Sequence, residues 1–192
     1  MVETFSPNQL EKRQQIIDAA RQVLAQHGLM ACTARAIADA SPLTKSAIHY
    51  YFTDMDEIID AAMAWHIDAF VERLRSVAAR YKAPPDRFWA VVGDYLACFE
   101  ETPNAATLWL EYWIDSVRRG RPRAMKRTVE PVLEFLETVF EGLQTRDAAA
   151  KAHALLSYLL GTIVQQQVHK LSFDALRPEV IALLRLPPEF TR

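Results

Sequence analysis

Three consecutive side chains that can donate hydrogen bonds to phosphates or base edges open a short segment of helical apolar periodicity. These are Thr44, Lys45 and Ser46, and Ile48 and Phe52 follow at the spacing of one buried helical face. A helix that presents its first residues in this way can enter the major groove of DNA while the preceding helix crosses the backbone. The chemistry predicted here is recognition of a nucleic acid.

The elements that must position these residues are two short helices with a break between them, within the segment TARAIADASPLTKSAIHYYF, residues 33–52. Thr33 is the expected N-cap of the first helix, whose buried side has Ile37 and Ala40, and Pro42 lies in the break. The side chains expected to face outward on the second helix are Lys45, Ser46, Ala47, His49 and Tyr50.

The composition of the 192 residues restricts the other classes of function. The chain is 51% hydrophobic and 24% charged, as is usual for a folded soluble protein, and its five glycines are too sparse for a phosphate-cradling loop. The two cysteines form no CxxC pair, the five histidines have no metal-ligand spacing, and no apolar run is long enough to span a bilayer. We expect a cytoplasmic protein with no cofactor, metal site, signal peptide or catalytic motif, and hence no enzyme.

Helical periodicity extends through the whole chain, and prolines mark most of the breaks. The sequence predicts an all-α fold of about nine or ten helices, with one domain at residues 1–53 and a second at 54–192. A long helix over residues 54–80, roughly 40 Å at 1.5 Å per residue, would connect the two. We expect an Asn8 cap on the first helix, which Gly28 ends, a kink or a helix start at Pro131, and a long helix from Asp147 to His169. The last short helix is expected to begin at Pro178.

Aromatic residues are dense on two successive helices of the second domain, and a histidine lies on the apolar stripe of the connecting helix. At helical spacing such residues are most often ordinary core, but their density also suits a pocket for a flat or cationic small molecule. The candidate ligand-binding residues are His66, Trp89, Tyr95, Phe99, Trp109, Tyr112 and Trp113.

Two apolar stripes near the end of the chain are expected to pair as a four-helix bundle across a two-fold axis. The candidate dimer-interface residues are Leu136, Val139, Phe140, Leu155, Leu159 and Ile163. A further feature is the run of basic residues between Arg118 and Arg127. A solvated surface is the simplest interpretation of this run, and an anionic effector or a second nucleic-acid contact are the alternatives.

The first helix with Gly28, T-x-R-x-I-A from Thr33, L-T-K-S-A-I-H-Y-Y-F from Leu43 and D-E-I from Asp56 together resemble the DNA-binding domain of TetR/AcrR-family regulators. The resemblance covers roughly residues 9–62. The rest is similar only in its layout, and L-W-x-E-Y-W is weakly similar to the ligand domains of BetI-like members. The resemblance implies DNA contacts by Arg35, by Thr44, Lys45 and Ser46, and by Tyr50 and Tyr51.

The sequence departs from the family pattern at four positions. Pro42 and Ser46 replace frequent glycines, His49 replaces a common tyrosine, and Met55 replaces the usual lysine at the start of the connecting helix. Since proline cannot adopt positive φ, Pro42 requires a different turn geometry from glycine.

These observations favour a homodimeric transcriptional repressor that binds a palindromic double-stranded DNA operator and is released by a small-molecule effector. Ala47 and His49 complete the predicted DNA-binding set. The charge of residues 1–52 is only about +1, with five basic and four acidic side chains, so binding would depend on a few placed contacts. The alternatives are a helical interaction adaptor with weakened DNA binding, which Pro42 and Met55 favour, and an α-helical enzyme.

Overall fold

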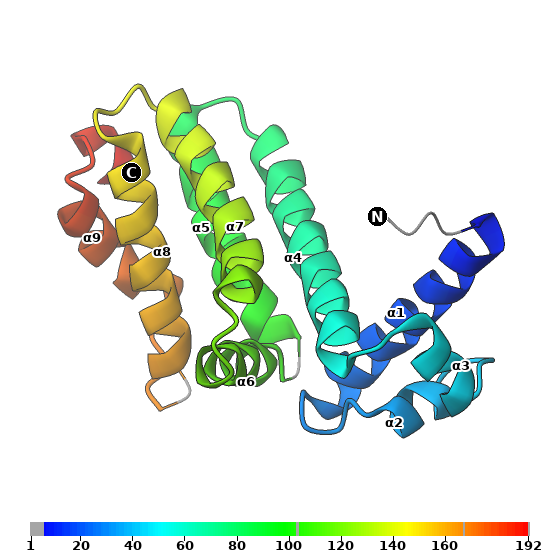
Figure 1. Cartoon of the computed structure of the whole chain (residues 1–192). Helices are drawn as coiled ribbons and strands as arrows, with labels where there is room; N and C mark the ends of the chain where they lie inside the picture. Colours follow the sequence, from blue (N-terminus) through cyan, green and yellow to red (C-terminus); the bar gives the residue numbers. More distant parts are fainter. Residues whose placement is uncertain (1–5, 103, 167, 192) are drawn as a thin grey trace. The chain divides into compact units, whose positions relative to one another are not determined.

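The computed structural model describes residues 6–102, 104–166 and 168–191, and within these ranges it contains helices and no strand, which confirms the all-α class. Nine α-helices and one 3-10 helix are present in the described residues (Figure 1). They are α1 (Pro7–His27), α2 (Ala34–Asp39), α3 (Lys45–Tyr51), α4 (Met55–Ala79), α5 (Pro84–Glu101), α6 (Ala105–Arg118), α7 (Pro122–Gly142), α8 (Ala148–Gln165), α9 (Phe173–Leu184) and η1 (Pro188–Thr191).

Packing divides the chain into two compact units. Unit 1 consists of residues 1–67 and 107–128, and unit 2 consists of residues 68–106 and 129–192. Unit 1 therefore contains α1 to α3, the first half of α4, most of α6 and the first turns of α7. The predicted boundary after residue 53 divides the chain by function and stays a prediction, whereas these units are defined by packing alone.

Local capping signals explain the helices of the N-terminal region. Ser6 caps α1 in a reciprocal capping box with Gln9, because Pro7 occupies the first helical position, so the prediction of an Asn8 cap was wrong. Gly28 ends α1 with φ +79°, a backbone conformation that favours glycine. The helix packs into the core of unit 1 through Ile16 and Leu24, which are fully buried.

The core beneath α2 and α3 is built from the predicted apolar positions, with one exception. Ile37, Ile48 and Phe52 are 0%, 1% and 2% exposed and join the same cluster as α1. Ala40, expected to be buried, is exposed at the end of α2, and Ala34 is the buried alanine of that helix. A six-residue helix has less than two turns, so its buried side is too short to include both.

Two helix-end predictions were wrong in the C-terminal half, and of the two alternatives for Pro131 the structure excludes the helix start, while the kink stays a prediction. The helix α7 begins at Pro122 and includes Pro131, and α9 begins at Phe173, where the hydroxyl of Ser172 caps Ala175 N–H, and includes Pro178. The helix α8 ends at Gln165 and not at His169. In α9, burial of Leu176 and Val180 compensates for the backbone hydrogen bond that an interior proline removes.

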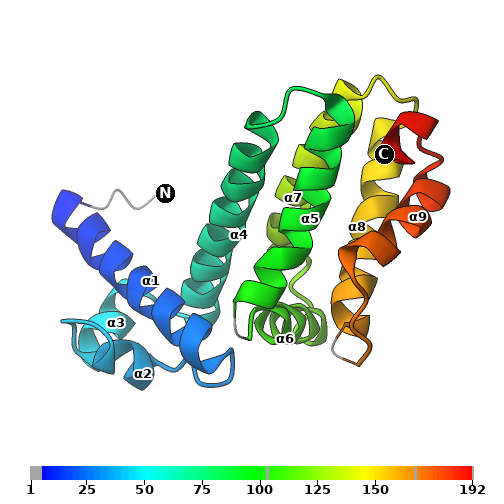
Figure 2. The same cartoon turned by 180° about the vertical axis from the view of Figure 1, so that it is seen from behind.

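Unit 2 is held together by an aromatic cluster and by ion pairs. The Phe88 ring lies 5.7 Å from Phe140 and 5.5 Å from Phe190, centroid to centroid, and joins α5, α7 and η1. Arg73 donates two hydrogen bonds to Asp94, each 2.8 Å, and so ties the second half of α4 to α5. Figures 1 and 2 both show α5, α7 and α8 running alongside one another, with α9 against α8.

The structure also bears on the cysteines and on membrane-spanning helices. Cys32 is buried and Cys98 partly buried, and both are free thiols. Among the described helices, none combines the length and the apolar character that crossing a bilayer requires.

Candidate nucleic-acid interface

The recognition helix predicted from the sequence is α3, and its N-terminal side chains are exposed. Lys45, Ser46, His49 and Tyr50 are exposed, whereas Ala47 is partly buried. The hydroxyl oxygen of Thr44 accepts a hydrogen bond from the Ala47 N–H at 3.2 Å and caps the helix. Its hydroxyl hydrogen remains available to donate to a phosphate or a base.

The two tyrosines at the end of α3 differ in exposure. Tyr50 is 74% exposed, and its ring meets that of Tyr51 edge-on, with centroids 5.0 Å apart. Tyr51 is partly buried and packs against the core cluster of unit 1. Of the pair, Tyr50 therefore has the surface that a DNA backbone contact needs.

Arg35 lies on α2, the helix that precedes the turn. Its side chain is exposed, and α2 begins at Thr33, whose hydroxyl accepts from Ala36 N–H at 3.2 Å. Arg35 thus belongs to the same small assembly as α3, held by caps at both helix starts.

The turn between α2 and α3 accommodates Pro42 without any residue in the left-handed region. Among the described residues, those with positive φ lie elsewhere in the chain. The Ser41 hydroxyl accepts a hydrogen bond from the Leu43 N–H at 3.2 Å. This local bond stabilises the turn, so the turn does not need the positive φ that a glycine could adopt. Pro42 is therefore compatible with a complete helix-turn-helix.

Arg13 of α1 holds the end of α3 in place, a role that the sequence did not reveal. Its guanidinium donates to the Tyr51 carbonyl oxygen, lies 3.9 Å from the centroid of the Phe52 ring, and pairs with Glu57 of α4 at 2.5 Å. These partners are some forty positions away, and no periodic pattern connects them. Arg13 positions the recognition helix and does not itself face outward with it.

A cluster of five charged side chains joins α4 to the end of α6 within unit 1. Arg121 donates to Asp60 at 2.7 Å and to Asp115 at 2.8 Å, and its Nε lies 3.7 Å from Asp56. Arg119 pairs with Asp56 at 3.1 Å and with Asp115 at 3.0 Å. The Arg121 side chain is 16% exposed and that of Arg119 is 57% exposed, so Arg121 is the less exposed arginine of the cluster.

Tyr112 and Glu111 extend this connection along α6. The Tyr112 hydroxyl donates to Asp60 at 2.9 Å, and burial followed by the charge of Asp60 raises the pKa of Tyr112. Glu111 accepts from Leu29 N–H at 3.3 Å, just beyond the end of α1. The helix α6 thus contacts the α1 end and the first turns of α4.

The family model described as "Bacterial regulatory proteins, tetR family" matches residues 16–62, which contain the end of α1, the helix-turn-helix and the start of α4. Residues 16–62 therefore match the DNA-binding domain of the TetR family. Its relatives include PksA of Bacillus subtilis, 26% identical over 55% of this chain and 53% of that protein. A second relative, BetI of Stenotrophomonas maltophilia, is 26% identical over 60% of each chain. The matches therefore span a little over half of these curated relatives.

The fold of the chain is also that of solved proteins. The multidrug binding protein EbrR complexed with proflavin superposes with a TM-score of 0.70 and 22% identity, over 90% of this chain and 99% of that one. At this identity the likeness shows the fold alone.

Six of the seven predicted ligand-binding residues form two groups, one in each unit. In unit 1, Trp109 lies 6.5 Å from Tyr112 and 6.1 Å from Trp113, centroid to centroid. The indole N–H of Trp113 donates to Thr128 at 3.2 Å. Both tryptophans pack against the core cluster of unit 1, and Tyr112 belongs to it.

The second group lies on α5 in unit 2. Tyr95 and Phe99 are 5.8 Å apart and both meet Phe70 of α4 edge-on. Tyr95 is 2% exposed, and its burial raises its pKa. Trp89 is 7% exposed, and its indole N–H is already occupied by the Phe190 carbonyl oxygen at 2.9 Å. The site formed by all seven residues stays a prediction.

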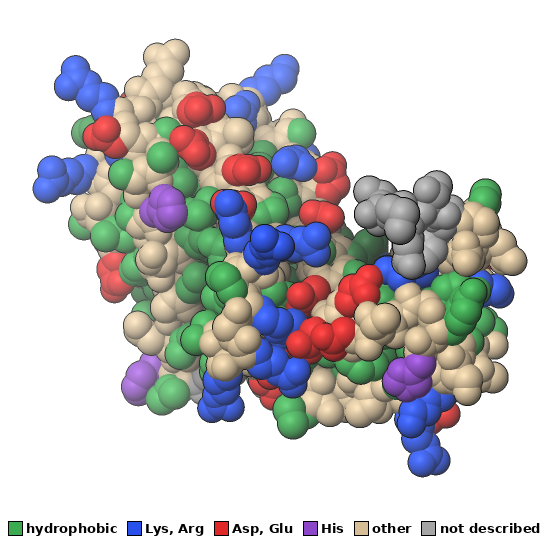
Figure 3. Space-filling view, in the orientation of Figure 1, with side chains coloured by type: hydrophobic (Ala, Val, Ile, Leu, Met, Phe, Trp, Pro, Cys, Tyr) green, Lys and Arg blue, Asp and Glu red, His purple; other side chains and the backbone are tan. Residues whose placement is uncertain are grey.

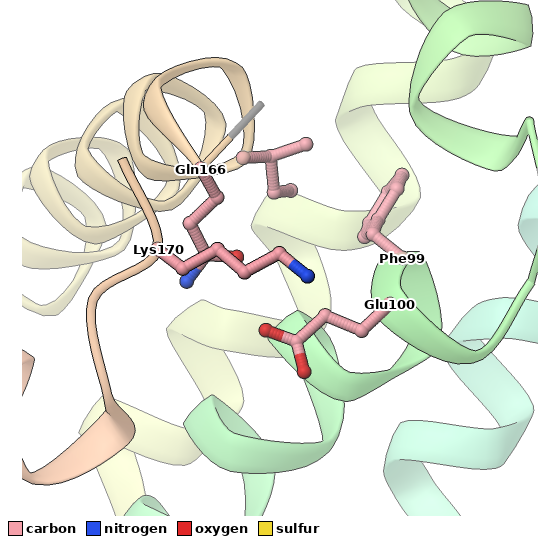
Figure 4. A pocket seen from close by; sticks show the side chains of 5 residues that line it. Phe99, Glu100, Gln166 and Lys170 are labelled. Atoms are coloured by element: carbon pink, nitrogen blue, oxygen red, sulfur yellow. The ribbon is translucent and has the colours of Figure 1, made fainter. Parts of the chain in front are cut away.

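Two cavities in unit 2 lie beside the second group. One has a volume of about 340 Å³ and is lined by Phe99, Glu100, Ile163, Gln166 and Lys170. Figure 4 shows Glu100 and Lys170 extending toward this space from α5 and from the segment after α8. A neighbouring cavity of about 370 Å³ shares Glu100, Gln166 and Lys170. Of the predicted ligand-binding residues, Phe99 lines the first cavity.

His66, the remaining member of the predicted set, is a partly buried residue of α4. Its Nε2 has no hydrogen-bond partner among the described residues. Burial, and then the positive charge of Arg21, lower the pKa of His66, although a hydrogen bond with the Arg21 backbone opposes them. His66 therefore favours its neutral form in the folded chain.

This lowered pKa makes a testable contribution to stability. Because the unfolded chain binds a proton on His66 more readily, the free energy of unfolding should decrease as the pH falls below about 6.5. In His66→Gln this part of the pH dependence should be absent. Urea unfolding of both proteins at pH 7.5 and pH 5.5 measures it, and an equal loss on acidification in both would contradict the assignment.

The six predicted dimer-interface residues are buried within the single chain. Leu136, Val139, Phe140, Leu155, Leu159 and Ile163 are 0–7% exposed and belong to the core. Their side chains thus pack inside the chain itself and leave little surface for contact with a second copy. Val164 of α8 is a large apolar residue with 47% exposure.

Proposed function

We propose that this protein is a ligand-responsive transcriptional regulator that binds a palindromic operator as a homodimer, and that it acts as a repressor released by a small-molecule effector. The observation that supports this most is the N-terminal half of α3, whose polar side chains are exposed and whose backbone is fixed by the Thr44 cap and by Arg13. The match of residues 16–62 to the tetR family model supports the same proposal.

In the proposed complex, α3 enters the major groove. Lys45 and Ser46 reach base edges or phosphates, Thr44 donates its hydroxyl hydrogen, and Tyr50 and Arg35 contact the backbone on either side. One helix of seven residues reads few base pairs. Two copies about one helical turn of DNA apart, or at a multiple of that spacing, would read a palindrome and multiply the affinity.

The effector is proposed to act through α4 and α6. The helix α4 is continuous from unit 1 to unit 2, and the Arg121 cluster fixes its first two turns to α6. A ligand that favours one placement of these helices needs a coupling free energy of only about 1–3 kcal/mol to change operator occupancy substantially. The related EbrR was solved with proflavin, a flat molecule of the kind that an aromatic site accepts.

The dimer is proposed to form through the outward faces of α7 and α8. Val164→Glu places a charge on this face without entering the core, since Val164 is 47% exposed. We expect this variant to fold with unchanged helicity and to sediment as a monomer. Val117→Glu, at a 67% exposed position of α6, is the matched control for this measurement and should sediment as the wild type does. Two variants with the same dimer affinity would place the interface elsewhere.

Selection from random duplex DNA tests the whole proposal. We expect recovery of an inverted repeat whose half-sites are separated by about 10 base pairs or a multiple. If selection enriches no sequence even at low salt, the proposal is wrong, and a helical interaction adaptor becomes the better interpretation.

A further inference from the structure

The charge of unit 1 is distributed unevenly along the sequence. Residues 1–67 contain five basic and eight acidic side chains, a net charge of −3, whereas residues 107–128 contain six basic and two acidic side chains, a net charge of +4. Unit 1 as a whole therefore has a net charge of +1. The part that contains the helix-turn-helix would by itself repel a polyanion, and the α6–α7 segment reverses the sign.

Three arginines of this segment are exposed and have no ion pair among the described residues: Arg118 at the end of α6, and Arg123 and Arg127 in the first turns of α7. Arg123 and Arg127 are four positions apart and so share one face of α7. Figure 3 shows Lys and Arg side chains gathered, beside Asp and Glu, over the region where α6 and the start of α7 lie in Figure 1.

The structure fixes this segment to the same compact unit as the recognition helix. Arg121 and Arg119 attach it to Asp56 and Asp60 of α4. Glu111 attaches it to the backbone at Leu29. The three exposed arginines are thus held at a constant place relative to α3. The three carboxylates of the cluster are paired with Arg119 and Arg121 and not with these arginines.

We propose that Arg118, Arg123 and Arg127 form a second contact with operator DNA, made to phosphates and independent of base sequence. Guanidinium groups bind phosphate oxygens with two parallel hydrogen bonds, and the charge that residues 107–128 add is the complement of a duplex backbone. The contact rests on the proposed function, since it assumes that α3 binds DNA. The two parts of unit 1 would then have different roles. The helix α3 would recognise the base sequence, and the arginines would supply the electrostatic attraction that residues 1–67 lack.

The double variant Arg123→Gln with Arg127→Gln tests this contact. Fluorescence anisotropy measures the affinity for the selected operator and for a scrambled duplex at several KCl concentrations. Each phosphate contact contributes about 0.9 to the slope of log affinity against log salt, so the slope should decrease by about 2 per subunit. Affinity at low salt should fall more than 10-fold for both duplexes, with their ratio unchanged, and Arg123→Lys with Arg127→Lys should restore it.

The matched control removes two positive charges from unit 2. Arg80→Gln with Lys82→Gln changes exposed residues just beyond α4, and it should leave the salt slope near that of the wild type. If both double variants have the same slope, the proposed contact is wrong. A changed ratio between the two duplexes would likewise overturn it in favour of base reading. A wild-type protein that binds no duplex would instead disprove the proposed function itself.

Discussion

Replacement of Arg121 by methionine is expected to lower the free energy of unfolding by about 2–4 kcal/mol. This is the largest loss of stability that we predict for any substitution in this protein. Methionine retains much of the length and apolar volume of the arginine stem but leaves Asp60 and Asp115 without their nearest cation. We place the loss below that of a fully buried pair because the three carboxylate side chains remain 20–28% exposed. Urea unfolding followed by circular dichroism measures it.

Arg119→Met is the matched control for Arg121→Met. Both arginines pair with Asp56 and Asp115, but the Arg119 side chain is 57% exposed and water screens its charge. We expect a clearly smaller loss for Arg119→Met. Equal losses in the two variants would mean that burial does not distinguish them and that Arg121 does not hold the cluster together.

Lys45→Ala is expected to weaken operator binding at least about 30-fold without destabilising the fold. A base or phosphate contact contributes about 1 kcal/mol or more, and the proposed dimer loses two of them. The side chain is exposed at the first residue of α3, where the helix dipole disfavours a cation, so its removal should not lower the melting temperature. Mobility-shift titration and a thermal melt measure the two quantities.

Lys82→Ala provides the control for Lys45→Ala, since it removes one exposed lysine outside unit 1. Its operator affinity should equal that of the wild type. If the Lys45 variant melts many degrees lower but binds the operator as tightly as the wild type, the assignment of α3 to the DNA interface is wrong.

The helix-turn-helix could be predicted from the sequence because its determinants are local. Thr33 and Thr44 cap helices within three residues of themselves, and Ile37, Ile48 and Phe52 mark the buried side. Pro178 misled the prediction for the opposite reason. Packing of the buried residues around Pro178 outweighs the local cost of an interior proline, and no short-range pattern indicates that balance.

The candidate sites show the same limit. Helical spacing identifies Tyr95 and Tyr112 as residues of apolar faces, but it does not indicate which partner each face meets, and the two belong to different units. The Arg121 cluster joins residues about sixty positions apart, with no periodicity between them. Its arginines were consistent with an ordinary solvated surface until their carboxylate partners were located.

The attachment of α6 to the first two turns of α4 limits how this protein can be re-engineered. A fragment ending at residue 67 lacks Glu111, Tyr112 and Arg121, and leaves Asp56 and Asp60 one turn apart without the cations they meet here. A chimera that transplants only the N-terminal helices onto a foreign sensor body would inherit this uncompensated charge. A transplanted fragment should therefore include residues 107–128 as well. The part of this chain that can be moved as one module is its compact unit, which is made of two segments far apart in the sequence.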